Sequence, residues 1–109
     1  MDAFPLTKGH SLVIPKSHYE KIQEISKDDN IDLFETVRKT ISKVDKITGA
    51  TLLAVHNGKE SGQEIPHVHV HLIPRSSDDS AGPVHSMFSK YVKFSEKEIQ
   101  NTLEKLREN

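Results

Sequence analysis

Three histidines at alternate positions, His67, His69 and His71, constrain this chain more than any other feature of its sequence. The residues between and after them are apolar: Val68, Val70, Leu72 and Ile73. Successive side chains of a β-strand point to opposite faces, so a strand over residues 67–73 would place the three imidazoles on one face. The opposite face, made of the two valines and Leu72, can then pack on a helix. The histidine face is left open to a ligand.

Imidazole side chains that share a strand face are suited to phosphate chemistry. Neighbouring residues on such a face are about 7 Å apart, which lets two imidazoles reach one anionic ligand. Imidazole can attack phosphorus because its ordinary pKa of about 6.5 leaves it partly unprotonated near neutral pH. A flanking imidazolium can stabilise negative charge on the phosphoryl oxygens. The pattern therefore indicates a site where a bond to phosphorus is made and broken.

Two other interpretations of the three histidines stay open. They can be half-buried residues without a role, although three alternate histidines would be an unusual way to fill a strand. They can also chelate zinc, because imidazole is a common zinc ligand. No carboxylate or cysteine lies within residues 67–73 to complete or orient such a site, so phosphorus chemistry is the preferred interpretation.

The apolar pattern predicts an α+β fold: an antiparallel sheet with a long helix packed on one face and a C-terminal helix. Strands are expected over residues 11–15, 50–56 and 67–73. A short helix is expected over residues 17–25. Residues 57–66 are expected to form a polar loop, and residues 75–93 an irregular segment.

The two longer helices have recognisable ends. The first is expected to take its N-cap from the run Asp28 to Asn30 and to stop at Gly49. Its apolar stripe comprises Phe34, Val37, Ile41, Val44 and Ile47. The last helix is expected to start with Ser95 as N-cap and Glu98 as capping-box partner. Its apolar stripe comprises Ile99, Leu103 and Leu106.

Composition narrows the class of protein. A chain of 109 residues fits one domain, expected to span 1–109 with a triad core at about 2–75 and a tail and helix at 76–109. Hydrophobic residues make up only 34%, so part of the stability is expected to come from self-association. The 15 basic and 16 acidic residues leave no excess of positive charge that would bind a nucleic-acid backbone. With no cysteine and no apolar run of roughly 20 residues, we expect a cytoplasmic protein without a membrane partner.

Several separated motifs resemble one family, the histidine triad (HIT) superfamily. The segment from His67 to Ile73 matches its signature of three histidines that alternate with apolar residues. Other segments are similar in type and order: Lys8-Gly9-His10, Leu12-Val13-Ile14-Pro15-Lys16, Gly62-Gln63-Glu64 and Ile73-Pro74-Arg75. The resemblance runs from about Asp2 to Arg75.

The resemblance implies a homodimeric nucleotide hydrolase or nucleotidyl transferase. Its substrate would be a small nucleotide, either a nucleoside 5′-phosphoramidate or a dinucleoside polyphosphate. His69 would attack the α-phosphorus and form a nucleotidyl-histidine intermediate, which water then hydrolyses. The family implies no cofactor and no metal for this step. Two alternatives are a nucleotide-binding or interaction protein with weak or lost turnover, and a metal-dependent hydrolase that uses the three triad histidines.

The resemblance also assigns roles to individual residues. His71 would contact the phosphate, while His67 and His10 would support the site. The remaining residues would bind the nucleotide: Gln63, Glu64 and Ile65 along the phosphates, Asp2 at the ribose hydroxyls, and His56 or Asn57 at the phosphates in place of the Asn or Gln of many relatives. His18 and His85 are expected to lie outside the site. Relatives usually carry a helix and a strand before the position of Asp2, so we expect a shortened member with an incomplete base pocket.

Overall fold

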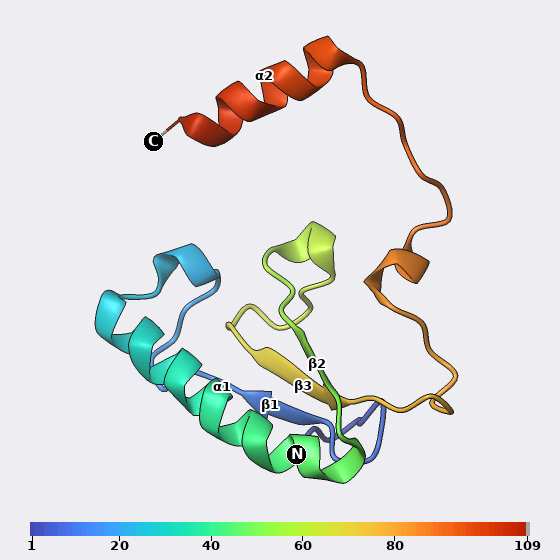
Figure 1. The fold of residues 1–109 in the computed structure, drawn as a ribbon. Helices are drawn as coiled ribbons and strands as arrows, with labels where there is room; N and C mark the ends of the chain where they lie inside the picture. The colour runs from blue at the N-terminus through green and yellow to red at the C-terminus, as the bar shows by residue number, and fades with distance from the viewer. Residues whose placement is uncertain (109) are drawn as a thin grey trace.

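The sheet is antiparallel and three-stranded, with the histidine-bearing strand in its centre. A computed structural model describes residues 1–108. Strand β3 (Val70–Pro74) lies between β1 (Ser11–Val13) and β2 (Thr51–Ala54). Helix α1 (Lys27–Thr48) packs against all three strands (Figure 1). The predicted α+β fold, with a long helix on one face of an antiparallel sheet and a C-terminal helix, is therefore confirmed.

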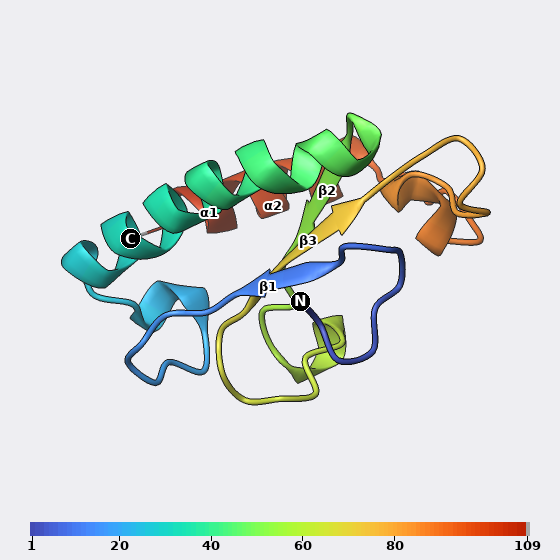
Figure 2. The same cartoon turned by 90° about the horizontal axis from the view of Figure 1, so that it is seen from below.

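One helix and three short turns complete the secondary structure: the 3-10 turns η1 (Ile22–Glu24), η2 (Lys59–Ser61) and η3 (Val84–Met87), and helix α2 (Glu96–Arg107). Figure 2 shows the N-terminal segment and the loop between β2 and β3 on the side of the sheet away from α1. One face of the sheet therefore packs on a helix, and the other is bordered by loops.

Helix α1 begins earlier than the sequence predicted. Its N-cap is Ser26, whose hydroxyl accepts a hydrogen bond from the Asp29 N–H at 3.2 Å. Asp28 and Asp29 lie instead in the first turn, where the positive end of the helix dipole stabilises carboxylates. The predicted end at Gly49 is confirmed: this glycine has a φ of 88°, and its N–H donates to the Asp45 carbonyl at 2.7 Å.

The predicted short helix over residues 17–25 is wrong except for the turn η1. The chain before η1 lies against the triad segment, because the Val68 N–H donates to the Tyr19 carbonyl at 2.7 Å. The Tyr19 carbonyl thus holds the triad segment. A side chain from the loop after β2 holds η1, since the Ile22 N–H donates to Asn57 Oδ1 at 2.9 Å.

The core lies between α1 and the sheet. The buried residues of this cluster are Val13, Leu33, Val37, Val44, Val68, Val70 and Leu72. The predicted packing of the apolar triad face on the long helix is therefore confirmed. The predicted stripe on α1 is only partly correct, because Phe34 is 41% exposed and Ile47 is 48% exposed, whereas Leu33 is buried.

All three strands are shorter than predicted, and the difference matters most for β3. Its sheet pairing begins where Val70 faces Val13 of β1, so His67 and His69 lie before the strand. The alternation of buried valines and cavity-facing histidines nevertheless continues before the strand, because Val68 is buried in the same core as Val70. The triad is therefore divided between a strand, which carries His71, and the loop that enters it.

After β3 a tight turn redirects the chain. The Asp79 carboxylate accepts hydrogen bonds from the Arg75 guanidinium at 2.6 Å and from the Ser76 and Ala81 amides, each at 3.0 Å. The Arg75 guanidinium, followed by the two amides, holds the pKa of Asp79 well below its ordinary value. The residues after this turn extend away from the sheet.

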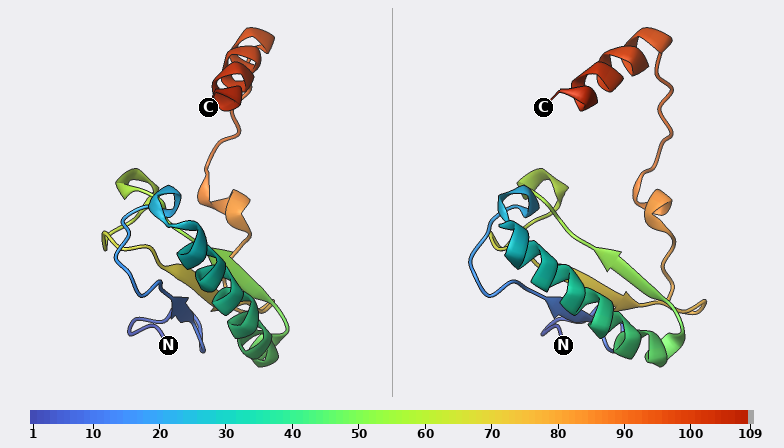
Figure 3. Two further views of the ribbon diagram at one scale, coloured as in Figure 1. Left: turned by 90° about the vertical axis from the view of Figure 1, so that its left-hand side faces the viewer. Right: turned by 60° about the vertical axis from the view of Figure 1, so that its left-hand side comes forward.

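Helix α2 stands apart from the rest of the described chain (Figures 1 and 3). Ser95 and Glu98 form the predicted capping box. The predicted apolar stripe of Ile99, Leu103 and Leu106 is present but exposed, and within residues 1–108 no other helix or strand packs on it. Neither α1 nor α2 has the length and apolar character that a bilayer span requires.

Candidate active site

A cavity of about 520 Å³ opens beside His71. It is lined by most of the residues that the sequence assigned to the site: Asp2, His10, His56, Glu64, Ile65, His67, His69 and His71. Apolar side chains complete the lining, among them Phe4, Leu6, Leu12 and Ile14. Leu12 lies directly opposite His71 in the pairing of β1 with β3. The structure thus gathers histidines from three separate segments around one opening.

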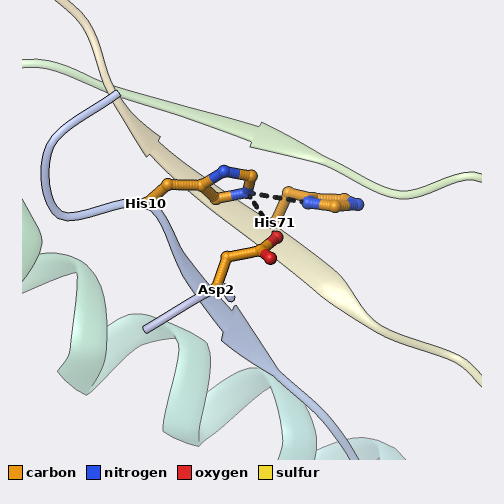
Figure 4. A group of neighbouring side chains, drawn as sticks. All are labelled: Asp2, His10 and His71. Carbon is orange, nitrogen blue, oxygen red and sulfur yellow. Dashed lines mark hydrogen bonds and ion pairs between the residues drawn. The ribbon is translucent and has the colours of Figure 1, made fainter. Parts of the chain in front are cut away.

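His10 is the buried member of this group, with an exposed fraction of only 1%. Its Nδ1 accepts a hydrogen bond from the Leu6 N–H at 3.1 Å. An imidazole with a lone pair on Nδ1 carries its proton on Nε2. That nitrogen lies 2.9 Å from His71 Nδ1 and 3.5 Å from Asp2 Oδ2 (Figure 4). His10 therefore donates to His71.

The donation from His10 fixes the state of His71. Because Nδ1 of His71 accepts, its own proton must lie on Nε2. Burial, followed by the positive charges of His69, His10 and His56, lowers the pKa of His71 below its ordinary value, and Asp2 opposes the shift. His71 is thus held as a neutral imidazole whose Nε2–H is free to donate to a ligand.

His69 is oriented by its own backbone neighbour. Its Nδ1 lies 2.8 Å from the His67 carbonyl oxygen, which can only accept. The proton of neutral His69 is therefore on Nδ1, and Nε2 keeps its lone pair. The His69 and His71 rings are 5.0 Å apart and nearly perpendicular. A nucleophilic nitrogen and a proton donor are thus placed side by side.

His67 has a partner that the sequence analysis left outside the site. Its Nδ1 lies 3.1 Å from Nδ1 of His18, and the two rings are 13° from parallel. His18 comes from the segment that also holds the Val68 N–H through Tyr19. The two histidines are 49 positions apart in the chain, so no local pattern around His18 points to the pairing.

Asn57 and Gln63 do not line the cavity, although the sequence predicted them as nucleotide ligands. Gln63 is 8% exposed, accepts from the Gly58 N–H at 2.8 Å and donates to the Glu20 carbonyl at 2.8 Å. Asn57 accepts from the Ile22 N–H and donates to Gln23 Oε1 at 3.0 Å. Both amides hold the loop after β2 against the segment before α1.

His56 does reach the site. Its ring lies 5.5 Å from that of His71, edge to face, and its other side lies against Gly62. A Cβ on Gly62 would come within 3.2 Å of the His56 ring, and the glycine has a φ of 110°. The loop therefore needs a glycine here for both space and backbone conformation.

Asp2 is held by its own neighbours. Its Oδ1 accepts from the Phe4 N–H at 2.9 Å, and this bond is the main reason that the pKa of Asp2 lies below its ordinary value. Burial opposes the shift, and electrostatic interactions with the rings of His10, His71 and His69 add to it. A carboxylate at the rim of the cavity is a suitable acceptor for hydroxyl groups, and its contact with ribose stays a prediction.

Asp2, His10 and His71 also offer ligand atoms within 4.8 Å of one another, a spacing that a metal ion could use. The hydrogen bonds argue against that use. A metal needs a lone pair, but the bond from Leu6 commits Nε2 of His10 to carry a proton. The group fits a hydrogen-bond chain better than a coordination site.

The chain resembles known proteins over the part that builds this site. A family model described as the HIT domain matches residues 1–78. An asymmetrical bis(5′-nucleosyl)-tetraphosphatase of Schizosaccharomyces pombe is 36% identical over 69% of this chain and 42% of its own length. An adenosine 5′-monophosphoramidase of the same yeast is 34% identical over 72% of this chain and 58% of its own length. The matched part thus spans less than two thirds of either relative.

Solved structures extend the likeness to the tail. A protein from Leishmania major superposes on 97% of this chain and 74% of its own with a TM-score of 0.77, at 30% sequence identity. The matched region thus includes most of the tail and α2.

Proposed function

This chain belongs to the HIT domain family, and on that premise we propose that it is a nucleotide hydrolase or nucleotidyl transferase. We propose a nucleoside 5′-phosphoramidate or a dinucleoside polyphosphate as its substrate, the two classes named for the yeast relatives. One observation carries the proposal. The bond from His69 Nδ1 to the His67 carbonyl leaves Nε2 of His69 unprotonated, on a residue that lines the cavity.

In the first step, Nε2 of His69 attacks the α-phosphorus. The bond between phosphorus and the leaving group breaks as the new N–P bond forms, giving a nucleotidyl-histidine. The neutral His71 donates its Nε2–H to a phosphoryl oxygen, where negative charge increases in the transition state. His10 acts through His71, because its Nε2–H keeps the lone pair of His71 Nδ1 occupied.

In the second step, water attacks the same phosphorus and releases the nucleoside monophosphate. His69 regains its lone pair and remains bonded to the His67 carbonyl. The open cavity rim of Glu64 and Ile65, both exposed, suits the phosphates of a substrate that extends toward solvent. We further propose that two chains associate, since Ile31 and Phe34 of α1 and Leu53 of β2 leave apolar surface exposed.

The test is a mass measurement of the intact protein mixed rapidly with a slow nucleotide substrate. We expect an adduct of one nucleotide that maps to His69, and none in His69→Ala. Tight binding of a nucleoside monophosphate without any adduct would indicate a binding protein instead. Loss of turnover on chelation, with recovery on added zinc, would indicate a metal-dependent hydrolase.

A further inference from the structure

We propose that His18 and His67 form a proton relay that serves the leaving group of the substrate. In this relay His67 touches the substrate, and His18 is a positioning residue that acts through His67. The relay rests on the proposed function and goes beyond it, because it concerns the fate of the leaving group and not the nucleophile.

The first support is the geometry of the pair. The two Nδ1 atoms are 3.1 Å apart, and the rings are 13° from parallel with centroids 4.9 Å apart. Such a bond needs one nitrogen with a proton and one with a lone pair, so the two rings share a single proton between them. His67 lines the cavity beside His69, and with Nδ1 engaged its Nε2 is the nitrogen left for a ligand.

The second support is the contrast between the two histidines that flank His69. On one side, His71 leads to His10, which is 1% exposed and has its far nitrogen occupied by the Leu6 N–H. That chain ends at the buried His10 and the Asp2 carboxylate, whose lowered pKa keeps it unprotonated near neutral pH, so it offers no exposed imidazole. On the other side, His67 leads to His18, which is exposed. The His67 side therefore places an exposed imidazole behind the one that faces the cavity.

The proton balance follows from this arrangement. At the start His18 is an imidazolium and His67 is neutral, with its proton on Nε2. As Nε2 of His69 forms its bond to phosphorus and the leaving-group bond breaks, His67 gives its Nε2 proton to the leaving atom. His67 Nδ1 takes the proton of His18 Nδ1, which leaves both rings neutral. When water attacks in the second step, its proton goes to His67 Nε2 and the Nδ1 proton returns to His18.

The experiment compares two substrates with the same nucleoside 5′-phosphate. One has an alkylamine leaving group, which must be protonated to depart, and the other has a 4-nitrophenol, which departs as the anion. We expect His18→Ala and His18→Asn to slow the first step for the alkylamine by about 100-fold or more, because a positioned proton donor typically contributes roughly 10²- to 10⁴-fold. The loss for the 4-nitrophenyl ester is expected to be at least about tenfold smaller.

The asparagine variant separates a relay from a merely structural contact. Its side chain can keep a hydrogen bond to His67 but cannot pass on a proton. If His18→Asn turned over the alkylamine substrate like the wild type, or if both substrates slowed by the same factor, the relay would be overturned. Added imidazole is expected to restore part of the alkylamine rate to His18→Ala and none to His18→Asn.

Two controls keep the relay and the proposed function distinguishable. His85→Ala, which removes an exposed histidine of the tail, is expected to keep wild-type rates with both substrates. His69→Ala is expected to lose both reactions. An active His69→Ala, or a wild-type protein inactive on both substrates, would overturn the proposed function, and the relay with it. If the His18 variants slowed both substrates by the same factor, only the relay would be overturned.

Discussion

Four histidines around the cavity each have a ring nitrogen bonded to a protein partner, and that bond decides what the other nitrogen can do: His10, His67, His69 and His71. His10 is fixed by the Leu6 amide, and His71 is fixed by His10. His69 is fixed by the His67 carbonyl. Chemically identical side chains are thus given different roles, a proton donor in His71 and a lone-pair donor in His69.

The lowered pKa of His71 makes the stability of the protein depend on pH. The contribution of neutral His71 is complete above the ordinary histidine pKa of about 6.5 and is lost as the pH falls from there to the folded value. We therefore expect the free energy of unfolding to fall as the pH drops through the ordinary histidine pKa of about 6.5. Urea unfolding of the wild type and of His71→Gln measures the effect. An equally steep decline in both proteins would contradict the assignment.

Gln63 is expected to contribute to stability through its side-chain amide. In Gln63→Ala the Gly58 N–H and the Glu20 carbonyl lose their partner in a buried place, so the free energy of unfolding should fall by about 1–3 kcal/mol. Chemical denaturation measures the loss. Gln100→Ala, on the exposed face of α2, is the matched control and should change stability by less than about 0.5 kcal/mol.

At this scale the sequence predicted which residues surround the cavity better than it predicted their bonds. His69, His71, His10 and Asp2 were expected in the site and line it. The amides of Asn57 and Gln63 have the right chemistry for phosphate, but backbone groups that loops leave unpaired bind them first. His18 was missed because its contact depends on the path of a loop, which no local periodicity encodes.

The turn after β3 depends on one side chain, that of Asp79. Asp79 accepts from one guanidinium and two amides, and its pKa is lowered mainly by Arg75. Its contribution to stability is therefore complete above the ordinary carboxyl pKa of about 3.9 and declines as the pH falls below it. The turn sets the direction in which the tail leaves the sheet.

We expect Asp79→Asn to loosen this turn. Loss of the charged acceptor should speed hydrogen exchange at the Ser76 and Ala81 amides by roughly tenfold at neutral pH. Amide exchange followed by NMR measures the effect. Asp78→Asn is the matched control, because Asp78 is exposed and accepts only from the Ser76 hydroxyl. Equal acceleration in both variants would count against the role of Asp79.

Helix ends were predicted correctly where the sequence offers one capping residue, and incorrectly where it offers two. Ser95 and Gly49 each had no rival, and the predicted ends are confirmed. Ser26 and the acidic run after it can both cap a helix, and the structure uses the serine. The triad strand was predicted to start too early, because the alternation of histidine and apolar residues begins before Val70, the first residue that has a sheet partner.

Over the whole molecule, one face of the sheet is used for packing and the other for the site, while the tail belongs to neither. The helix α2 and the segment before it contribute no residue to the core. We propose that residues 1–109 nevertheless act as one domain, with the reaction confined to the part before the tail. Hydrophobic residues make up only 34% of the chain, and several large apolar side chains of α1, β2 and α2 are exposed.

A homodimer is the expected form of the protein in solution. Sedimentation velocity should give close to twice the chain mass of 12.3 kDa. Phe34→Asp places a charge on the exposed apolar surface of α1 and should shift the protein toward the monomer, whereas Lys43→Asp on the same helix should not. A wild-type protein that sediments as a monomer at high concentration would refute the dimer.

The bond between the Val68 amide and the Tyr19 carbonyl has a consequence for the evolution of the site. It ties the first histidine of the triad to a loop, while the last is tied to the sheet. Insertions or exchanges in the loop around Tyr19 would therefore move one end of the triad and leave the other in place. If the proposed relay holds, changes in this loop would alter which leaving group is accepted and keep the same attacking nitrogen.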